Sequence, residues 1–361
     1  MIRRLLTGFA AVGLLLALGC KEPDGGSSGG TTGVALYAYD STSTSVFVWS
    51  DLSALYDSTT TVAPTKTITS SVFGSKITSL AWGGLCFDRQ NGYLYLVSDT
   101  GNIVRVRNIR TQSGDVASSD VVSFSLASTG RLATSTFGQA SLDMQTDTLY
   151  ITENGTSGTQ IWVVSNASTQ PQSATIALQA LAASGDTGGT GVAASSGSVY
   201  AFMLSGDTVG TVTTYTGPRL RKGTSSGFTD ANTIIGPATL LGQYGSLALD
   251  TGNGYLFVAR HNTDAGASTA PILVFTTGMF GQAYDQAPTA TLGTDADQPN
   301  LRVIAHAGTK DWLVGLRGSG ATAFATIDLW KSPMGGTAAK TITASPAGSL
   351  FKGVAVDGNA S

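Results

Sequence analysis

Apolar and polar positions alternate in a recurring pattern along most of the chain. A short apolar segment is followed by a turn rich in Asp and Gly, and then by a second, aromatic-rich apolar segment. The clearest copies are Gly-Leu-Cys-Phe-Asp-Arg-Gln-Asn-Gly-Tyr-Leu-Tyr-Leu-Val at 84–97 and Ser-Leu-Ala-Leu-Asp-Thr-Gly-Asn-Gly-Tyr-Leu-Phe-Val at 246–258. Alternation with aromatic residues favours half-buried strands, and Asp and Gly favour tight turns. The pattern therefore predicts pairs of antiparallel strands.

The pattern forms a repeat with a nearly constant spacing. The first apolar residues of the copies are Leu85, Ala140, Val192, Leu247, Val303 and Val354, at intervals of 51 to 56 residues. Third strands are predicted at 102–107, 160–164, 272–275 and 325–330, and fourth strands at 121–126, 174–178, 289–292 and 340–343. Several strands in a repeat of this length are typical of β-propeller blades.

The two ends of the chain complement each other. The last copy, 353–361, has a first strand and then stops in the turn. The N-terminal part begins with a second strand at 34–39, and it continues with a third at 45–49 and a fourth at 65–68. Pairing of these ends would remove a free sheet edge. We predict an all-β, six-bladed β-propeller whose closing blade is shared between the two ends; seven blades would follow if 34–39 were a first strand.

The first twenty residues have the organisation of an export signal. Two arginines, Arg3 and Arg4, precede an apolar stretch at 5–18, which is shorter than the roughly 20 residues of a membrane-spanning helix. Gly19-Cys20 resembles the lipobox of bacterial lipoproteins, with Ala17 where that motif usually has Leu. The resemblance implies cleavage before Cys20 and lipidation of its thiol. The alternative is an ordinary signal peptide with a chance cysteine.

These features predict the domain organisation and the cellular localisation. Residues 1–19 are the signal peptide, residues 20–33 are the lipidated Cys20 and a Gly/Ser-rich tether, and residues 34–361 are one propeller domain. A flexible tether lets the domain stand away from the membrane. Lys21, rather than Asp, follows the cysteine and favours the outer membrane over the inner membrane. We therefore expect a lipid-anchored protein of the bacterial cell envelope.

Composition excludes some classes of function. Charged residues make up 12% of the chain and the net charge is −3, whereas a typical soluble domain is about 25% charged. The densest basic cluster is Arg219, Arg221 and Lys222, which is too small for a nucleic-acid-binding surface. Once Cys20 carries lipid, Cys86 has no cysteine to pair with, and its place in an apolar strand predicts a small core residue.

The Gly-Leu-x-x-Asp turn followed by an aromatic strand resembles the NHL-type and gluconolactonase-like six-bladed propellers. The resemblance covers nearly all of the mature chain and concerns structural residues, so it does not carry function with it. We expect the aspartates of the copies to cap the turns between first and second strands. They are Asp88, Asp143, Asp250 and Asp357, and His306 replaces the aspartate in the fifth copy, where we expect a turn hydrogen bond.

Candidate ligand-binding residues lie where the first strands begin, because these positions line the channel mouth of a propeller. They share an aromatic or polar character and include two cations: Trp82, Phe137, Gln139, Tyr244, Asn300, Arg302, Phe351 and Lys352. Such a set could stack a sugar or clamp a peptide. The alternative is that the large rings merely plug the channel.

An enzyme is the less favoured interpretation. The gluconolactonase-like resemblance implies an axial divalent metal held by Glu, Asn and Asp, and of these only Asn300 is matched in type. A hard cation needs several oxygen ligands, and Arg302 and Lys352 would repel it. Asp295 and Asp297 resemble turn residues more than a calcium loop, and His261 has no evident Ser or Cys partner. We predict no catalytic residue, metal or cofactor.

Three functional hypotheses follow, in order of preference. The first is a binding platform for an envelope protein or a polysaccharide, because an anchor, a tether and a mostly uncharged surface accompany the propeller pattern. The second is a metal-dependent, lactonase-like hydrolase with its site on the propeller axis. The third is sensing of a sugar or another small molecule through the aromatic channel mouth.

Overall fold

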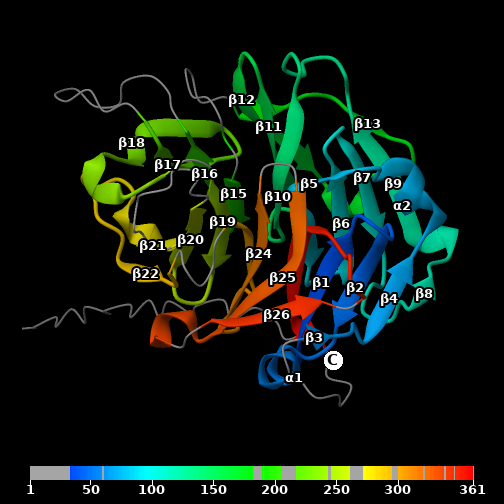
Figure 1. The fold of residues 1–361 in the computed structure, drawn as a ribbon. Coiled ribbons are helices and arrows are strands. Elements are labelled where there is room, and N and C mark those ends of the chain that lie inside the picture. The colour runs from blue at the N-terminus through cyan, green and yellow to red at the C-terminus, as the bar shows by residue number, and fades with distance from the viewer. Residues whose placement is uncertain are drawn as a thin grey trace, which may run out of the picture. The chain divides into compact units, whose positions relative to one another are not determined.

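A computed structural model describes residues 33–58, 61–181, 189, 191–204, 217–242, 245–260, 271–294, 300–319, 322–336, 339–344 and 346–360. Residues Thr31–Ser361 form one compact unit, and its described elements are mainly β-strands (Figure 1). Within the described residues, no helix is both long and apolar enough to cross a membrane.

Most strands belong to antiparallel meanders of four, each built from one sequence repeat. One contains β5 (Leu80–Asp88), β6 (Tyr93–Ser98), β7 (Asn102–Val106) and β9 (Val121–Leu126). The next contains β10 (Thr136–Asp143), β11 (Thr148–Gly155), β12 (Gly158–Ser165) and β14 (Ala180–Leu181). A third contains β15 (Gly191–Ser195), β16 (Ser198–Met203), β17 (Arg219–Thr224) and β18 (Gly227–Ile235). A fourth contains β19 (Gly245–Asp250), β20 (Tyr255–Arg260), β21 (Ile272–Thr276) and β22 (Ala290–Leu292).

The remaining meanders belong to one larger hydrogen-bonded sheet. The first contains β23 (Leu301–His306), β24 (Trp312–Ser319), β25 (Thr322–Lys331) and β26 (Lys340–Ala344). The second contains β27 (Phe351–Ala360), β1 (Gly33–Asp40), β2 (Ser45–Trp49) and β4 (Lys66–Thr69). A single residue pair, Phe324 with Phe351, joins β25 to β27.

The chain ends pair as the sequence predicts. Strand β27 runs antiparallel to β1, with Tyr37 opposite Ala355 and Gly33 opposite Ala360. The Leu350 amide also donates to the Asp40 carboxylate at 2.7 Å. One expectation is wrong here: the last copy does not stop in a turn, because the strand continues through Asp357 to Ala360. Backbone hydrogen bonds along this strand therefore tie the two ends together.

The first strand of each repeat contacts the first strands of the repeats before and after it along the chain. Strand β10 contacts β5 and β15, and β19 contacts β15 and β23. Strand β27 contacts both β23 and β5, which completes a cycle. The outer strands lie away from this cycle because each meander runs from its first strand to its fourth.

Two-residue strands link neighbouring meanders in a way that the sequence did not predict. Strands β3 (Thr61–Val62), β8 (Gly114–Asp115) and β13 (Thr175–Ile176) add in parallel to the outer strands β26, β4 and β9. The predicted fourth strand at 174–178 is therefore wrong, because β13 pairs with the preceding meander and β14 takes the fourth position. Two short helices, α1 (Leu52–Asp57) and α2 (Ser71–Lys76), were also not predicted.

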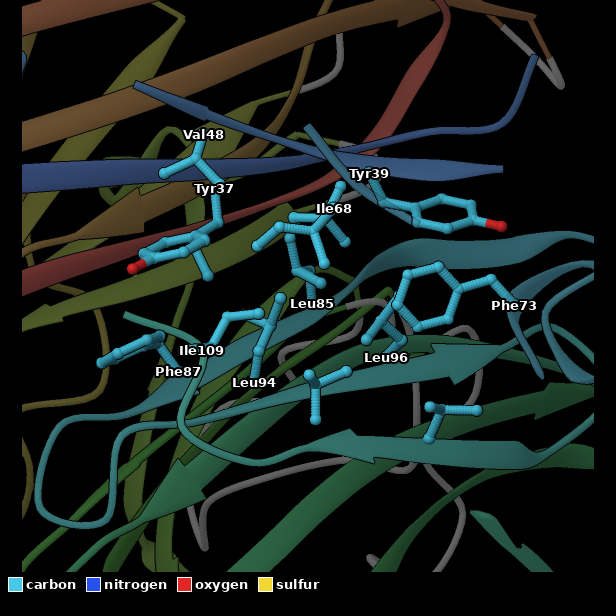
Figure 2. Close-up of a cluster of buried hydrophobic side chains, with 14 of the residues drawn as sticks. Tyr37, Tyr39, Val48, Ile68, Phe73, Leu85, Phe87, Leu94, Leu96 and Ile109 are labelled. Atoms are coloured by element: carbon cyan, nitrogen blue, oxygen red, sulfur yellow. The ribbon is translucent and has the colours of Figure 1, made fainter. Parts of the chain in front are cut away.

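Apolar side chains pack between the faces of neighbouring meanders. Figure 2 shows one such cluster, with side chains from β1, β2 and β4 facing others from β5 and β6. Tyr37 stacks on Phe87 with ring centroids 5.2 Å apart, and Phe73 of α2 meets Tyr39 edge-on. Burial of this kind, at roughly 25 cal/mol per Å² of apolar area, is the main force that holds such sheets together.

The turn aspartates behave as predicted in three copies. Asp88 accepts the backbone N–H groups of Gln90 and Asn91 at 3.0 Å. Asp250 makes the equivalent bonds, and Asp143 accepts from Gln145 and also from the turn of the next repeat. In the last copy the expectation is wrong, because Asp357 lies within β27 and pairs with Arg110.

Candidate ligand site

Four first strands bulge close to the point where they begin. Register shifts occur within β5 between Leu80 and Leu85, and within β10 between Phe137 and Ala140. Single extra residues, Arg302 and Lys352, interrupt the registers of β23 and β27. A bulge re-aims the side chain of its extra residue and is over-represented beside functional sites. The bulged segments contain four predicted site residues: Trp82, Gln139, Arg302 and Lys352.

The side chains of Arg302 and Lys352 both lie beside the indole ring of Trp82. The Arg302 guanidinium carbon lies 4.2 Å from the ring centroid, and the Lys352 Nζ lies 5.9 Å from it. A Cβ at Gly318 of β24 would lie 2.3 Å from the indole Cη2, so glycine leaves the space that the ring occupies. Trp82, Arg302 and Lys352 are each half-buried. The ring quadrupole attracts both cations and fixes their positions.

A hydroxyl completes this group. The Lys352 ammonium donates to Ser79 Oγ at 3.0 Å, and the Asp99 backbone N–H donates to the Ser79 carbonyl at 3.0 Å. The ammonium is thus held by a neutral oxygen and an aromatic ring. We call Ser79, Trp82, Arg302 and Lys352 the Trp82 cluster. Its members supply positive charge, hydrogen-bond donors and an aromatic ring.

Gln139 has a different role from the one predicted for a ligand contact. Its Nε2 donates to the Leu247 carbonyl at 2.6 Å, and its Oε1 accepts the N–H groups of Leu247 at 2.8 Å and Val192 at 3.2 Å. The side chain is buried and thereby connects the first strands of three repeats. Its Cγ also lies 3.1 Å from the position of a Cβ on Gly83, directly after Trp82. Gln139 therefore lies beside the Trp82 cluster with its amide occupied by backbone.

The other predicted site residues do not join the Trp82 cluster in the same way. Phe351 is fully buried, with edge-on contacts to Phe47 and Trp49. Phe137 is also buried, against Trp162 and beneath the Arg131 guanidinium. Asn300 is half-buried with a left-handed backbone, and its carbonyl accepts the Gly318 N–H at 2.9 Å. Cys20, Tyr244, His261, Asp295 and Asp297 lie outside the described residues.

His306 does not make the expected turn hydrogen bond. Neither ring nitrogen has a hydrogen-bond partner among the described residues, and the ring stacks on Phe257 with centroids 5.4 Å apart. Burial lowers the pKa of His306 to about 4, and Asp250 and Asp311 partly oppose this shift. The imidazole is therefore neutral near pH 7 and packs as an aromatic ring. The replacement of aspartate by histidine identified this position in the sequence, but it did not predict that the ring would pack against Phe257.

Two other reactive side chains are structural. Burial, with a contribution from Asp88, raises the pKa of the Cys86 thiol, which packs against a hydrophobic cluster as predicted. Glu153, which sequence reasoning did not single out, is fully buried and accepts the Trp162 indole N–H at 2.6 Å and the Leu132 amide at 3.1 Å. Among the described residues, no three His, Cys, Asp or Glu side chains are grouped as metal ligands would be.

No protein-family model matches the chain, and no curated protein matches its sequence. A chain from the "Crystal structure of Nidogen/Laminin Complex" has a similar fold, with a TM-score of 0.54 and 12% sequence identity. The alignment covers 90% of this chain and 98% of that chain. At this identity the likeness concerns the fold alone, which is all-β and β-propeller-like.

Proposed function

We propose that this protein is a lipid-anchored lipoprotein of the bacterial cell envelope that presents a six-bladed, NHL-like β-propeller as a binding platform. The blade count is supported by the cycle of contacts through β5, β10, β15, β19, β23 and β27. Pairing of β1 with β27 supports a closing blade shared between the ends. The lipobox-like Gly19-Cys20 and the tether that follows support the anchor, with Lys21 favouring the outer membrane.

The observation that carries the binding function is the Trp82 cluster. Three bulged strands that are far apart in sequence bring one half-buried indole, one guanidinium and one ammonium together. Aromatic and arginine side chains are the groups that contribute most often to binding hot spots. Their position at the beginnings of the first strands corresponds to the channel mouth of a propeller. The ligand is an envelope polysaccharide or protein that contacts this mouth.

The platform is tested with the untethered domain, residues 31–361. We expect it to co-sediment with isolated peptidoglycan sacculi or to be retarded by a defined envelope polysaccharide in affinity electrophoresis. The double variant R302Q/K352Q should lose this binding. The matched control is K331Q, because Lys331 lies 5.9 Å from the ring centroid of Trp312 and repeats the lysine–indole geometry elsewhere. Binding that R302Q/K352Q leaves unchanged would place the ligand outside the mouth.

The anchor is tested separately in cells. Metabolic labelling with a fatty-acid analogue should label the wild-type protein, and C20S should abolish both the label and membrane fractionation. Secretion of an unlabelled wild-type protein would contradict lipidation while leaving the platform proposal intact.

A further inference from the structure

We infer that Arg105 and Tyr95 form an internal site for a small monovalent anion such as chloride. The site lies between the meander of β5 to β9, which carries both residues, and the meander of β10 to β14. It involves no residue of the Trp82 cluster, so the inference does not depend on the proposed binding function. The anion is a structural cofactor that links the two meanders.

Arg105 is a buried cation without an opposite charge. It is 1% exposed, and its Nη1 and Nη2 donate to the backbone carbonyls of Ala167 at 2.5 Å and Gln170 at 3.1 Å. No ion pair in the described part of the chain includes Arg105. Asp147 of the facing meander uses its two carboxylate oxygens on the amide and the hydroxyl of Ser168. A buried charge without compensation is costly, and a bound anion would remove this cost.

Two buried donors beside each other point to the place of the anion. Tyr95 is fully buried and lies directly opposite Arg105 in the β6–β7 pair, so both side chains leave the same face of the sheet. Within the described residues, neither the Tyr95 hydroxyl nor the Arg105 Nε–H has a hydrogen-bond partner. Burial raises the pKa of Tyr95, which keeps the phenol protonated as a donor. An anion that accepts from both groups satisfies two buried donors and offsets the charge.

The other repeats show that the fold does not require a cation at this position. The second- and third-strand pairs equivalent to Tyr95–Arg105 include Tyr37–Val48, Tyr150–Val163 and Phe257–Val274. Two further meanders have a charged residue here. Lys222 is half-buried, and the buried Asp328 is paired with Arg317. Arg105 combines full burial with the lack of an opposite charge, which none of its equivalents in the six described meanders does.

The surroundings of the two donors favour a small anion of single charge. Tyr95 belongs to a hydrophobic cluster that also contains Trp162 and Ala167 of the facing meander. A multiply charged oxyanion would lose much hydration there, and two donors and one positive charge would not replace it. A halide is weakly hydrated by comparison and accepts hydrogen bonds from any direction, so it matches one guanidinium N–H and one phenol.

The test measures the unfolding free energy of the untethered domain in urea at constant ionic strength, while chloride replaces methanesulfonate. Bromide scatters X-rays anomalously and locates a halide in crystals. Y95F removes one donor with little change in packing, and R105M removes the charge but keeps an apolar stem. Y150F is the matched control, because Tyr150 has the same register but lies opposite Val163.

A ligand that binds only the folded state adds about 1.4 kcal/mol of unfolding free energy for each tenfold rise above its dissociation constant. We expect this chloride dependence in the wild type and in Y150F, an affinity about tenfold weaker in Y95F, and no dependence in R105M. Without chloride, Y95F should be at least as stable as the wild type, whereas loss of a purely structural hydroxyl would destabilise it. If R105M does not fold, Y95F and the bromide position decide.

Three results would overturn the inference. They are an unfolding free energy that does not depend on chloride, the same chloride dependence in R105M as in the wild type, and bromide peaks that occur only away from Arg105 and Tyr95. Each of these results would leave the binding platform unaffected, because the platform is tested through the Trp82 cluster.

Discussion

Arg110 forms an ion pair with Asp357 of β27, the strand that closes the molecule, and we call this ion pair the clasp. Replacement of Arg110 should weaken the closure measurably. The guanidinium donates from Nε to Asp357 at 2.6 Å and from Nη2 to the second carboxylate oxygen at 3.0 Å. The Asp357 side chain is 0% exposed, whereas the Arg110 side chain is 27% exposed. Arg110 also donates to the Arg89 carbonyl and lies over the Phe87 ring. The clasp thus joins β27 to the β5–β6 turn of the next repeat.

The magnitude follows from this asymmetric burial. Removing one partner of a buried ion pair costs about 3–5 kcal/mol, because the remaining charge loses the attraction that offset its desolvation. Water can reach the vacated, partly exposed Arg110 site, so we expect R110Q to lose about 3 kcal/mol of unfolding free energy. In a domain of this size that corresponds to a fall of roughly 4 °C in Tm. D357N should cost less, about 1–2 kcal/mol, because the guanidinium can be solvated again and can still donate to the amide.

Urea unfolding of the untethered domain measures both costs. R107Q is the matched control, since Arg107 lies in the same segment and should change stability by less than about 0.5 kcal/mol. The double variant should lose less than the sum of the single losses, because both remove the same interaction. Equal stability of R110Q and R107Q, or a larger cost for D357N than for R110Q, would refute the clasp.

Three further predictions concern buried polar groups. The pKa of His306 is lowered to about 4 from an unfolded value near 6.5, so its stabilising contribution is complete above pH 6.5 and is lost as the pH falls toward 4. Between pH 7.5 and pH 5, the wild type should lose about 2 kcal/mol more than H306N in urea unfolding, and parallel pH profiles would contradict this. Q139L should destabilise the domain by about 3–5 kcal/mol, because it orphans the two backbone amides and the carbonyl that Gln139 binds; a loss under about 1 kcal/mol in denaturant unfolding would show that these groups find other partners. E153Q should cost about 1–3 kcal/mol and alter the near-UV circular dichroism of Trp162, and an unchanged spectrum would argue against that hydrogen bond.

Sequence reasoning predicted the closure well because it rests on a strong local signal. The last copy lacks a second strand, and the residues from Val34 to Tyr39 lack a first one, so the pairing of β27 with β1 follows from counting. The parallel strands β3, β8 and β13 escaped prediction because two residues carry no measurable periodicity. Their existence depends on the edge of a neighbouring meander, which is a tertiary effect.

The candidate site was predicted in part, for a similar reason. The repeat register identified Trp82, Arg302 and Lys352 as residues at the starts of first strands, and the structure brings these three together. It could not predict that Phe351 points into the core, because the bulge at Lys352 breaks the alternation on which side-chain direction depends. The repeat register also could not predict that the Gln139 amide hydrogen-bonds to backbone groups of two other repeats.

The most direct test of ligand binding at the Trp82 cluster is hydrogen-exchange mass spectrometry of the untethered domain with and without the envelope ligand that it binds most tightly. We expect slower exchange confined to the beginnings of β5, β23 and β27, around Trp82, Arg302 and Lys352. Protection at the turns of Asp88, Asp143 and Asp250, or along the outer strands β9 and β14, would contradict it. So would the failure of every peptidoglycan, polysaccharide and envelope-protein preparation to bind the domain.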